Sequence, residues 1–372
     1  MTASEPWVLQ FCHGYDGPFM DCARQYATLF VGTPYKVCTV YLTGAPCDEV
    51  IRGSGSDEVI FLDYSSRDVR GLKLAAIRDI RRLVGLRPYT LCIAHRFKPV
   101  YVALLGTALP VIGVHHAFGD YRRRSRQLFA NFYRKRLSLL GVSNAVRDDI
   151  RACLPDWLAE RIETLYNRID VEAVQAEQVP RGAARAHLGL PDHAWIVGNV
   201  GRLHPDKDQA TLIRAFAQAL PRLPAGSLLA FMGSGKLEAS LKSLAAELGV
   251  SEQVRFLGQV PHGRRYFKAF DLFALTSDHE PFGMVLLEAM AAGLPVVCSD
   301  CGGGQEVVKG VGEVFPFSDA ASLAAALVRL ALRADSTGHH CFIYERLQSR
   351  FSDTSARQQF WSLPMCASLP RG

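Results

Sequence analysis

The sequence lacks several features that would place it in common classes of protein. No uncharged apolar run approaches the ~18 residues that a membrane-spanning helix needs. The segment Met1–Phe11 has no basic stretch followed by a long apolar stretch, so we expect no signal peptide. No short-period repeat or low-complexity tract is present. These absences predict a soluble, cytoplasmic chain.

Features of metal, redox and nucleic-acid proteins are also missing. There is no recognisable nucleic-acid-binding module and no G-x-G-x-x-G after the first predicted strand, which argues against a dinucleotide oxidoreductase. Cys298 and Cys301 have the spacing of half a zinc or redox site, but no second Cys or His pair completes it. A buried strand-end cysteine followed by a loop cysteine is the alternative that we favour. We therefore expect no metal ion, no cofactor and no nucleic-acid partner.

What the sequence does contain is a long alternation of apolar runs and amphipathic stretches. Its 372 residues are too many for a typical single core, and continuous apolar runs are typical of parallel strands buried on both faces. Leu72–Val84 has the apolar stripe of a helix that covers such a sheet. Strands are predicted at Trp7–Phe11, Lys36–Leu42, Val59–Leu62, Thr90–Ala94, Val111–Val114, Leu137–Val142, Trp195–Val200, Leu228–Met232, Val254–Leu257, Leu272–Leu275 and Val296–Cys298. The pattern predicts an α/β fold with two Rossmann-like, doubly wound domains facing an interdomain cleft.

The strand pattern and the charge both change near the middle of the chain. Strands stop around Arg168–Pro191, which predicts an N-terminal domain at 1–170, a second domain at 171–350, and a terminal helix in 351–372 that packs back on the first domain. Residues 1–170 carry 23 Lys and Arg against 17 Asp and Glu, whereas residues 171–372 carry 19 of each. The excess positive charge therefore indicates an anionic partner for the first half only.

The most informative segment is Asp278–Gly304. A predicted strand is followed there by a polar loop, and a helix then begins near Gly283 and ends before Gly293 and Pro295. The N-terminus of a helix, with its unpaired amide groups and positive dipole end, suits a diphosphate. Glu288 is then placed to accept hydrogen bonds from ribose hydroxyls, and Glu280 to approach a sugar.

Glu280 and Glu288, eight residues apart around Pro-Phe-Gly, resemble the E-x7-E motif of family 4 retaining glycosyltransferases, which have the GT-B fold. The similarity continues nearly residue for residue from Ala289 to Val297. The resemblance implies a nucleotide-sugar donor site in the second domain, and the chain is similar to bacterial lipopolysaccharide-core glycosyltransferases.

Further segments of the second half match the same family. Gly198–Asp208 resembles the strand and loop that carry an Arg and a Lys, here Arg202 and Lys207, whose charges would neutralise the diphosphate. Phe231–Gly235 resembles the glycine turn after the next strand, and Val254–Pro261 the segment whose backbone meets the base. The resemblance predicts donor contacts at Gly17, Arg202, Lys207, Gly233, Val260, Glu280, Phe282, Gly283, Met284, Val285 and Glu288.

The first half resembles the family less closely. Asp16 and Gly17 stand where the family has a Gly-Gly loop, of which only the second glycine is present. His116 best matches the family's histidine near the transferred sugar, with His115 beside it. Catalytic roles are thus predicted for Glu280, His116, Arg202 and Lys207. Acceptor contacts are predicted for Asp16, His115, Arg122, Arg123, Arg124 and Ser143.

The stretch Tyr121–Leu140 holds seven basic residues interleaved with aromatic ones and is predicted as a basic helix. Such a helix binds an anionic membrane surface or a phosphorylated acceptor, and a solvated charged face is the alternative. This surface predicts a peripheral enzyme on the inner face of the cytoplasmic membrane.

The sequence as a whole predicts a retaining glycosyltransferase that moves a sugar, with a UDP-sugar as the first choice of donor, to a hydroxyl of a membrane glycolipid, an oligosaccharide or a lipopolysaccharide core. Two alternatives stay open at this point. They are a nucleotide-sugar 2-epimerase of the same fold and a non-catalytic module that binds nucleotide sugars.

Overall fold

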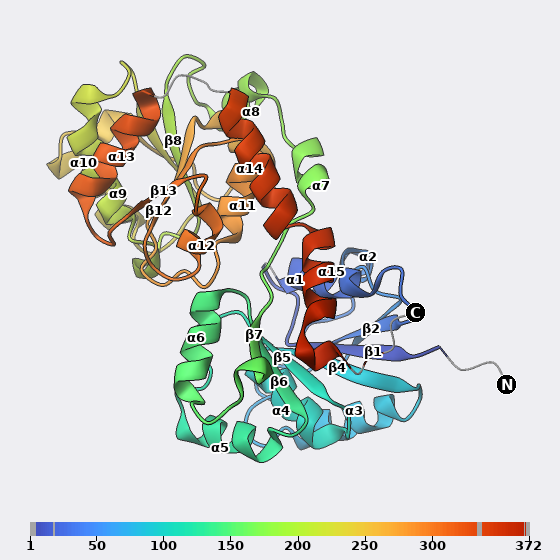
Figure 1. Ribbon diagram of the computed structural model, residues 1–372. Coiled ribbons are helices and arrows are strands. Elements are labelled where there is room, and N and C mark those ends of the chain that lie inside the picture. Colours follow the sequence, from blue (N-terminus) through green and yellow to red (C-terminus); the bar gives the residue numbers. More distant parts are fainter. Residues whose placement is uncertain (1–4, 18, 333–336, 368, 370–372) are drawn as a thin grey trace. The chain divides into compact units, whose positions relative to one another are not determined.

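The computed structural model describes residues 5–17, 19–332, 337–367 and 369, and it contains two compact units (Figure 1). The first unit combines residues 1–167 with 353–372, and the second comprises residues 168–352. The sequence placed these two boundaries at 170/171 and 350/351. Each unit is a parallel sheet flanked by helices, as the continuous apolar runs predict.

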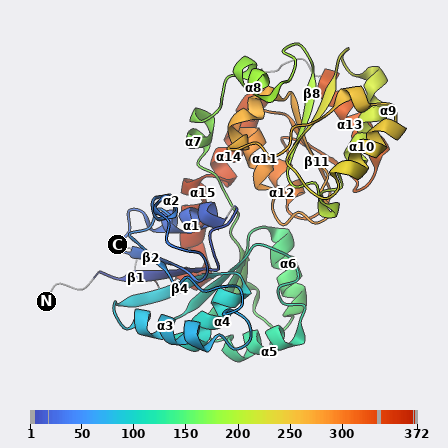
Figure 2. The same ribbon diagram turned by 180° about the vertical axis from the view of Figure 1, so that it is seen from behind.

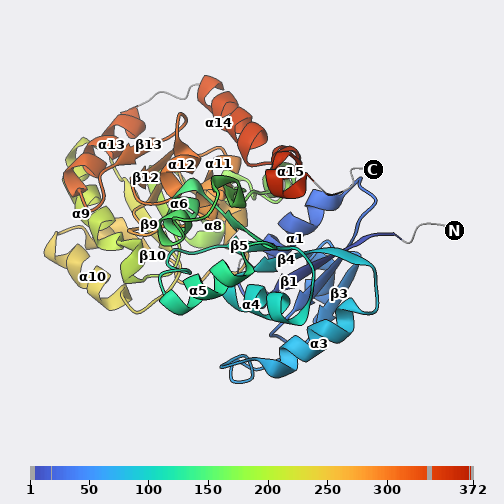
Figure 3. The same cartoon turned by 60° about the horizontal axis from the view of Figure 1, so that its bottom comes forward.

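The first unit is built on a seven-stranded sheet in the order β3-β2-β1-β4-β5-β6-β7, with every neighbouring pair parallel. Its strands are β1 Trp7–Cys12, β2 Lys36–Tyr41, β3 Glu58–Phe61, β4 Tyr89–His95, β5 Val111–His115, β6 Leu137–Gly141 and β7 Ile162–Thr164. Its helices are α1 Phe19–Ala27, α2 Asp48–Gly53, α3 Leu74–Val84, α4 Phe97–Gly106, α5 Arg124–Tyr133, α6 Asn144–Cys153 and α15 Asp353–Ser362. Helices α3, α4 and α5 gather on one side of the sheet (Figure 3).

Helix α15 returns the end of the chain to the first unit, beside the 3-10 helix Thr28–Phe30 that follows α1. Asp353 accepts a hydrogen bond from Arg24 at 3.0 Å. The indole N–H of Trp361 donates to the carbonyl of Leu29 at 2.9 Å, and the Phe360 ring meets the ring of Phe30 edge to face. An apolar and a charged contact together therefore fix this helix.

The second unit has a six-stranded parallel sheet in the order β10-β9-β8-β11-β12-β13. Its strands are β8 Ile196–Val200, β9 Leu228–Met232, β10 Val254–Phe256, β11 Leu272–Leu275, β12 Val296–Ser299 and β13 Glu313–Phe315. Its helices are α7 Val171–Ala176, α8 Arg181–Leu188, α9 Gln209–Ala219, α10 Glu238–Glu247, α11 Met284–Ala291, α12 Gly304–Val308, α13 Ala320–Leu332 and α14 Thr337–Arg350.

Helices α9, α10 and α13 lie together on one side of this second sheet (Figure 2). Leu212, Phe216 and Leu327 are fully buried there against strand residues such as Val197 and Phe231. A single apolar layer between helices and strands therefore holds the strand ends in register, and with them the loops that follow.

The strand order reverses direction once in each sheet, between β1 and β4 in the first and between β8 and β11 in the second. At such a point the two loops that leave the carboxyl ends of neighbouring strands run to opposite faces and open a crevice. The fold therefore marks the loops after β1 and β4, and those after β8 and β11, as the places for ligands.

Two sequence predictions about helices and membranes can be set against this fold. The basic helix predicted over Tyr121–Leu140 is wrong in extent, because α5 ends at Tyr133 and the chain is already in β6 at Leu137. No helix in the described ranges is long and apolar enough to cross a bilayer.

Candidate active site

The loops after β8 and β11 bring together two of the predicted catalytic residues. The Lys207 Nζ donates a hydrogen bond to Glu280 Oε2 at 2.8 Å, and the Ser277 hydroxyl donates to the same oxygen at 3.2 Å. The Lys207 and Glu280 side chains are 21% and 12% exposed, so the pair is mostly shielded from solvent. A cation and a carboxylate therefore meet at the switch point of the second sheet.

Two hydrogen bonds to backbone carbonyls fix these two loops to one another. The Thr276 hydroxyl donates to the carbonyl of Lys207 at 2.8 Å, and the amide of Asp278 donates to the carbonyl of Asp206 at 3.0 Å. The two loops thus behave as one element, and the Lys207–Glu280 pair does not depend on side chains alone.

A glycine turn supports the Lys207 loop from the β9 side. A Cβ atom on Gly233 would lie 2.0 Å from the carbonyl oxygen of Gly201, and one on Gly235 would lie 2.2 Å from that of Leu203. The amide of Leu203 donates to the carbonyl of Ser234 at 3.0 Å. The glycines at 233 and 235 are therefore required for the close approach of two backbones.

A second glycine pair supports Glu280. Gly302 has a φ of +68°, and a Cβ atom there would lie 2.2 Å from the carbonyl oxygen of Glu280. The amide of Gly303 donates to that same carbonyl at 2.7 Å. The Gly-rich loop after β12 therefore positions the Glu280 backbone, a role that the sequence did not assign to it.

Arg202 is placed differently from Lys207. Its side chain is 72% exposed and lies 3.4 Å from the Asp206 carboxylate, while its carbonyl accepts a hydrogen bond from Gln209 at 2.9 Å. Burial raises the pKa of Asp206, but its hydrogen bond to His204 and the charges of Lys207, His204 and Arg202 together hold that pKa below the usual value. The Arg202 guanidinium is thus free to turn toward a ligand at little cost.

Helix α11 begins beside this pair. Gly283, at its N-cap, has a φ of +98°, and within the described chain no side chain caps the helix there. The amides of Met284 and Val285 lie in the first turn, and Glu288 lies half-buried about one turn further along. This order places a positive helix end next to Lys207 and a carboxylate behind it.

Phe282 has a different role from the predicted donor contact. Its side chain is 2% exposed and packs edge to face on the ring of Phe351, with 5.8 Å between ring centres. The aromatic ring therefore anchors the start of α11 in the core of the second unit. Only its backbone is left to meet a donor.

Val260 and Gly17 complete the predicted donor set. Val260 is half-buried and lies in the loop after β10, close to the backbone of Gly263. Gly17, with a φ of +61°, forms an exposed turn with Asp16 after β1. Both positions lie at carboxyl edges, and their predicted roles stay predictions.

In the first unit, His116 lies directly after β5 and pairs with a histidine that the sequence did not single out. One ring nitrogen of His116 lies 3.1 Å from His95 Nδ1, and the other lies 3.9 Å from the Cys22 sulfur. Burial, and then the charges of His115 and Arg96, lower the pKa of His116 to about 3. His116 is therefore neutral at pH 7 and acts as a hydrogen-bonding group rather than as a cation.

The acceptor contact predicted for His115 is wrong for the side chain. The imidazole is fully buried and has partners on both nitrogens, the Asp120 carboxylate at 2.7 Å and the Tyr121 hydroxyl at 3.1 Å. The reason is geometric, because alternate residues of a strand point to opposite faces and His115 points into the core. It orders the loop after β5 rather than a ligand.

The acceptor contact predicted for Ser143 is also wrong. Ser143 is fully buried and its hydroxyl accepts a hydrogen bond from the amide of Val146 at 3.1 Å, which makes it the N-cap of α6. The Val-Ser pattern after a strand is therefore explained by helix capping.

The seven basic residues of 121–140 divide into three groups. Arg126 contacts Asp120 at 3.1 Å, and Arg136 donates to the carbonyls of Thr107 and Leu109, so both have structural roles. Arg122 is exposed but lies 3.2 Å from the Asp149 carboxylate. Four residues are exposed and have no carboxylate within 4.0 Å among the described residues: Arg123, Arg124, Arg134 and Lys135.

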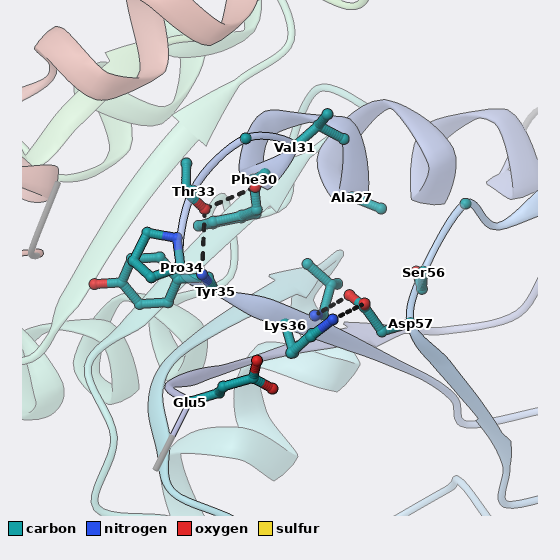
Figure 4. Close-up of a pocket in the computed structure, with 13 residues that line it drawn as sticks. Glu5, Ala27, Phe30, Val31, Thr33, Pro34, Tyr35, Lys36, Ser56 and Asp57 are labelled. Atoms are coloured by element: carbon teal, nitrogen blue, oxygen red, sulfur yellow. Dashed lines mark hydrogen bonds and ion pairs between the residues drawn. The ribbon is translucent and has the colours of Figure 1, made fainter. Parts of the chain in front are cut away.

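A pocket of about 440 Å³ lies elsewhere in the first unit, between the residues that precede β1, β2 and β3 (Figure 4). Lys36 and Asp57 point toward one another in it and form an ion pair at 3.2 Å. The pocket is thus at the amino edge of the sheet, away from the carboxyl edge where the strand order reverses, and the one cation that lines it among the described residues is already paired. We assign it no part in the site.

The chain is similar to known proteins in sequence, mainly over its second half. Residues 180–340 match the family described as glycosyl transferases group 1. Over 162 residues the chain is 42% identical to a D-inositol 3-phosphate glycosyltransferase of Nocardia farcinica, which covers 39% of this chain and 36% of that protein. Over 233 residues it is 34% identical to the lipopolysaccharide core biosynthesis glycosyltransferase LpsE of Rhizobium meliloti, which covers 60% and 65%. The chain thus covers less than two thirds of either relative.

Solved structures extend the similarity of fold to both units. A glycosyltransferase from Rickettsia africae superposes with a TM-score of 0.84 at 14% identity, over 99% of this chain and 100% of that one. Anabaena Alr3699/HepE, in complex with UDP and glucose, gives a TM-score of 0.73 at 21% identity, also over 99% and 100%. The two-unit α/β fold predicted from the sequence is confirmed. Residues 180–340 are therefore similar to the family of glycosyl transferases group 1.

Proposed function

We propose that the protein is a retaining glycosyltransferase that moves a sugar from a nucleoside diphosphate sugar to an acceptor hydroxyl. The observation that carries the proposal is the Lys207–Glu280 pair at the switch point of the second sheet, beside the uncapped start of α11. A cation and helix amides favour a diphosphate, and a carboxylate favours sugar hydroxyls.

Each residue has a defined part in this proposal. Lys207 and Arg202 stabilise the negative charge that develops on the leaving diphosphate. Electrostatic stabilisation of this kind is usually the largest single contribution to the rate enhancement by an enzyme. Glu288 accepts hydrogen bonds from the ribose, and Glu280 holds the sugar. Binding of the diphosphate requires Lys207 to exchange its Glu280 partner for a phosphate oxygen, and this leaves Glu280 free for the sugar.

UDP is the first choice of nucleotide in the donor, and a glycolipid or lipopolysaccharide core is the first choice of acceptor. The Anabaena protein binds UDP and glucose, and the Rhizobium relative is a lipopolysaccharide core enzyme. These are properties of the similar proteins, and they guide the first assays on this chain.

A peripheral association with an anionic membrane is a further part of the proposal. Leu128 and Phe132 are 70% and 80% exposed and lie one turn apart on α5. Arg124 lies one turn before Leu128, so that basic and apolar side chains share one exposed stripe. Such a stripe combines interfacial burial with attraction to anionic lipids.

A donor panel tests the proposed activity. The purified chain is incubated with UDP-, ADP- and GDP-sugars, with and without lipopolysaccharide-core and glycolipid acceptors, and nucleoside diphosphate and glycosylated product are measured. Acceptor-dependent release of one nucleotide supports the proposal. Isomerised sugar without an acceptor would identify a 2-epimerase, and binding without any turnover would identify a non-catalytic module.

A further inference from the structure

The carboxyl edge of the first sheet carries an unusual concentration of cations at its own switch point. His13 follows β1, while Arg96 and Lys98 follow the neighbouring strand β4. Arg70 and Lys73 lie in the segment that leads into α3. None of these five residues was singled out by sequence patterns.

Aromatic contacts connect Lys73 to Arg126 of α5. The Lys73 ammonium lies 4.8 Å from the ring centre of Tyr101, and the Arg126 guanidinium lies 4.4 Å from that of Phe97. Both rings pack on Phe129, at 4.9 Å and 6.0 Å between centres. Lys73 and Arg126 therefore lie on one connected aromatic platform.

These cations lack the counter-charges that other basic residues of the unit have. Arg24, Lys36 and Arg87 each have a carboxylate within 3.2 Å. In the described ranges, by contrast, no carboxylate lies within 4.0 Å of Arg70, Lys73, Arg96 or Lys98. The cluster thus carries an excess of positive charge, with the carboxylates of Asp16 and Asp120 acting on His13 and Arg96 without forming ion pairs with them in the described chain.

The positive charges also act on one another. Burial, and then Arg96, Arg70 and Arg126, lower the pKa of Lys98. Burial, and then Lys98 and Arg96, lower the pKa of His13 to about 4. Arg96 and Lys98 also flank the first residue of α4, where the helix dipole is itself positive. This arrangement is unfavourable unless an anion binds there.

We propose that this edge binds a phosphate monoester carried by the acceptor, with Lys73, Arg96 and Lys98 as its principal ligands. The inference rests on the proposed function and on the sequence prediction that the first unit contacts the acceptor. Arg202 and Lys207 in the second unit already provide the cations for the donor diphosphate. A phosphate monoester carries nearly two charges and three acceptor oxygens, which matches several converging cations better than a carboxylate does.

The test is direct binding to the full-length chain without any donor. Inorganic phosphate, glucose 6-phosphate, glucose and UDP are titrated calorimetrically into the wild type and into the double variant Lys73→Ala/Lys98→Ala. The matched control is Arg52→Ala/Arg82→Ala, which removes two exposed charges from the same unit. Thermal unfolding of each protein without ligand checks the fold.

We expect the wild type to bind phosphate and glucose 6-phosphate but not glucose, and the double variant to bind both at least about tenfold more weakly. UDP affinity should be unchanged. The double variant should unfold at the same or a higher temperature without ligand, because repulsion is removed. A merely structural role of the two lysines would lower that temperature.

Vesicles of phosphatidylcholine with and without phosphatidic acid distinguish the source of the phosphate. Lysine-dependent binding to the phosphatidic acid vesicles assigns it to a lipid headgroup, and binding to glucose 6-phosphate alone assigns it to a soluble sugar. The proposal would be overturned if the double variant bound phosphate with an affinity within a factor of two of wild type, or if the wild type bound no phosphate. It would also be overturned if the double variant lost as much affinity for UDP as for phosphate. Failure of the donor panel would leave this binding result intact, so the two proposals fail separately.

Discussion

Lys207 and Glu280 are 73 positions apart in the sequence, yet the Nζ of one lies 2.8 Å from the Oε2 of the other. The pair links the loop after β8 to the loop after β11, and the direct pairing of these two strands holds both loops in place. An ion pair that is mostly shielded from solvent has a larger electrostatic effect than one on the surface. The pair is therefore the natural target for the first substitutions.

Lys207→Ala should lower turnover roughly 10²–10³-fold, because one charge-assisted contact to the leaving diphosphate is lost. Arg202→Ala should act in the same direction. Turnover is measured with the sugar nucleotide that the donor panel identifies, and Lys309→Ala, at an exposed position of the same unit, is the control. Turnover within twofold of wild type in both variants would refute the assignment.

Glu280→Ala and Glu288→Ala should separate the contribution to sugar transfer from the contribution to nucleotide binding. Glu280→Ala should bind UDP as tightly as wild type or more tightly, since Lys207 is then free to meet the diphosphate, but it should transfer poorly. Glu288→Ala should weaken UDP binding about tenfold, the effect of losing one charged hydrogen bond. Calorimetry with UDP decides the matter, and equal losses in both variants would show that the division of roles is wrong.

Gly302→Ala should displace the backbone of Glu280, although Gly302 itself has no predicted contact with the donor. The substitution places a Cβ 2.2 Å from the carbonyl of Glu280 in addition to the strain of a positive φ. Gly310→Ala is the matched control, because its φ is +86° but no atom lies within 4 Å of the new Cβ. The positive φ should cost each variant about 1–2 kcal/mol of unfolding free energy, and overpacking should cost Gly302→Ala about 1–3 kcal/mol more. Only Gly302→Ala should lose transfer activity. If the two variants had similar urea unfolding curves and equal activities, Gly302 would not position the Glu280 backbone.

The fold could be predicted from the sequence because its strands are continuous apolar runs. The two strands that were missed, β7 Ile162–Thr164 and β13 Glu313–Phe315, have three residues each, contain a glutamate and lie at sheet edges. Edge strands bury less surface, and so their patterns are weak. Their existence depends on the neighbouring strand rather than on their own sequence.

The candidate site was only partly predictable, for a related reason. Glu280, Glu288, Arg202 and Lys207 lie in motifs, whereas His95 and Lys98 are recognisable only once β4 is placed beside β1 and β5. The local sequence around a single residue at a strand end does not show which residues of the neighbouring strands lie close to it. His115 and Ser143 show the opposite error, since residues in a familiar pattern proved to serve the core and a helix cap.

The exposed basic residues around α5 should bind the protein to anionic membranes. We expect the wild type to sediment with vesicles that contain anionic lipid, but not with neutral vesicles, and high salt to reverse this binding. Replacing Arg123, Arg124, Arg134 and Lys135 by Ser should abolish sedimentation, since each contributes about 1 kcal/mol near such a surface. Arg126 is left in place because it contacts Asp120.

The control for the membrane experiment removes four exposed charges elsewhere, at Arg52, Arg82, Lys268 and Lys309. It should sediment like the wild type, and both variants should still bind UDP. Indifference of the wild type to anionic vesicles at low salt would favour a soluble acceptor.

The buried histidines of the first unit should make its stability depend on pH. His95 is 2% exposed, and burial, followed by the charges of His116 and His115, holds its pKa well below the usual 6.5. Between pH 6.5 and that lowered pKa, the unfolded chain binds a proton that the folded chain does not. Stability is therefore complete above pH 6.5 and falls as the pH decreases, by up to about 1.4 kcal/mol per pH unit for each such histidine.

Urea unfolding of wild type and of His95→Gln at pH 7 and pH 5 tests this dependence on acid. Glutamine can still hydrogen-bond to His116 but does not titrate. Because the packing is altered, the variant should be less stable than wild type at pH 7. Its loss between pH 7 and pH 5 should nevertheless be smaller than that of wild type by about 2 kcal/mol. Carboxylates titrate mainly below this range and contribute alike to both proteins. If the two proteins lost the same free energy between these pH values, His95 would have to be protonated in the folded state, and the neutral His95–His116 pair would be disproved.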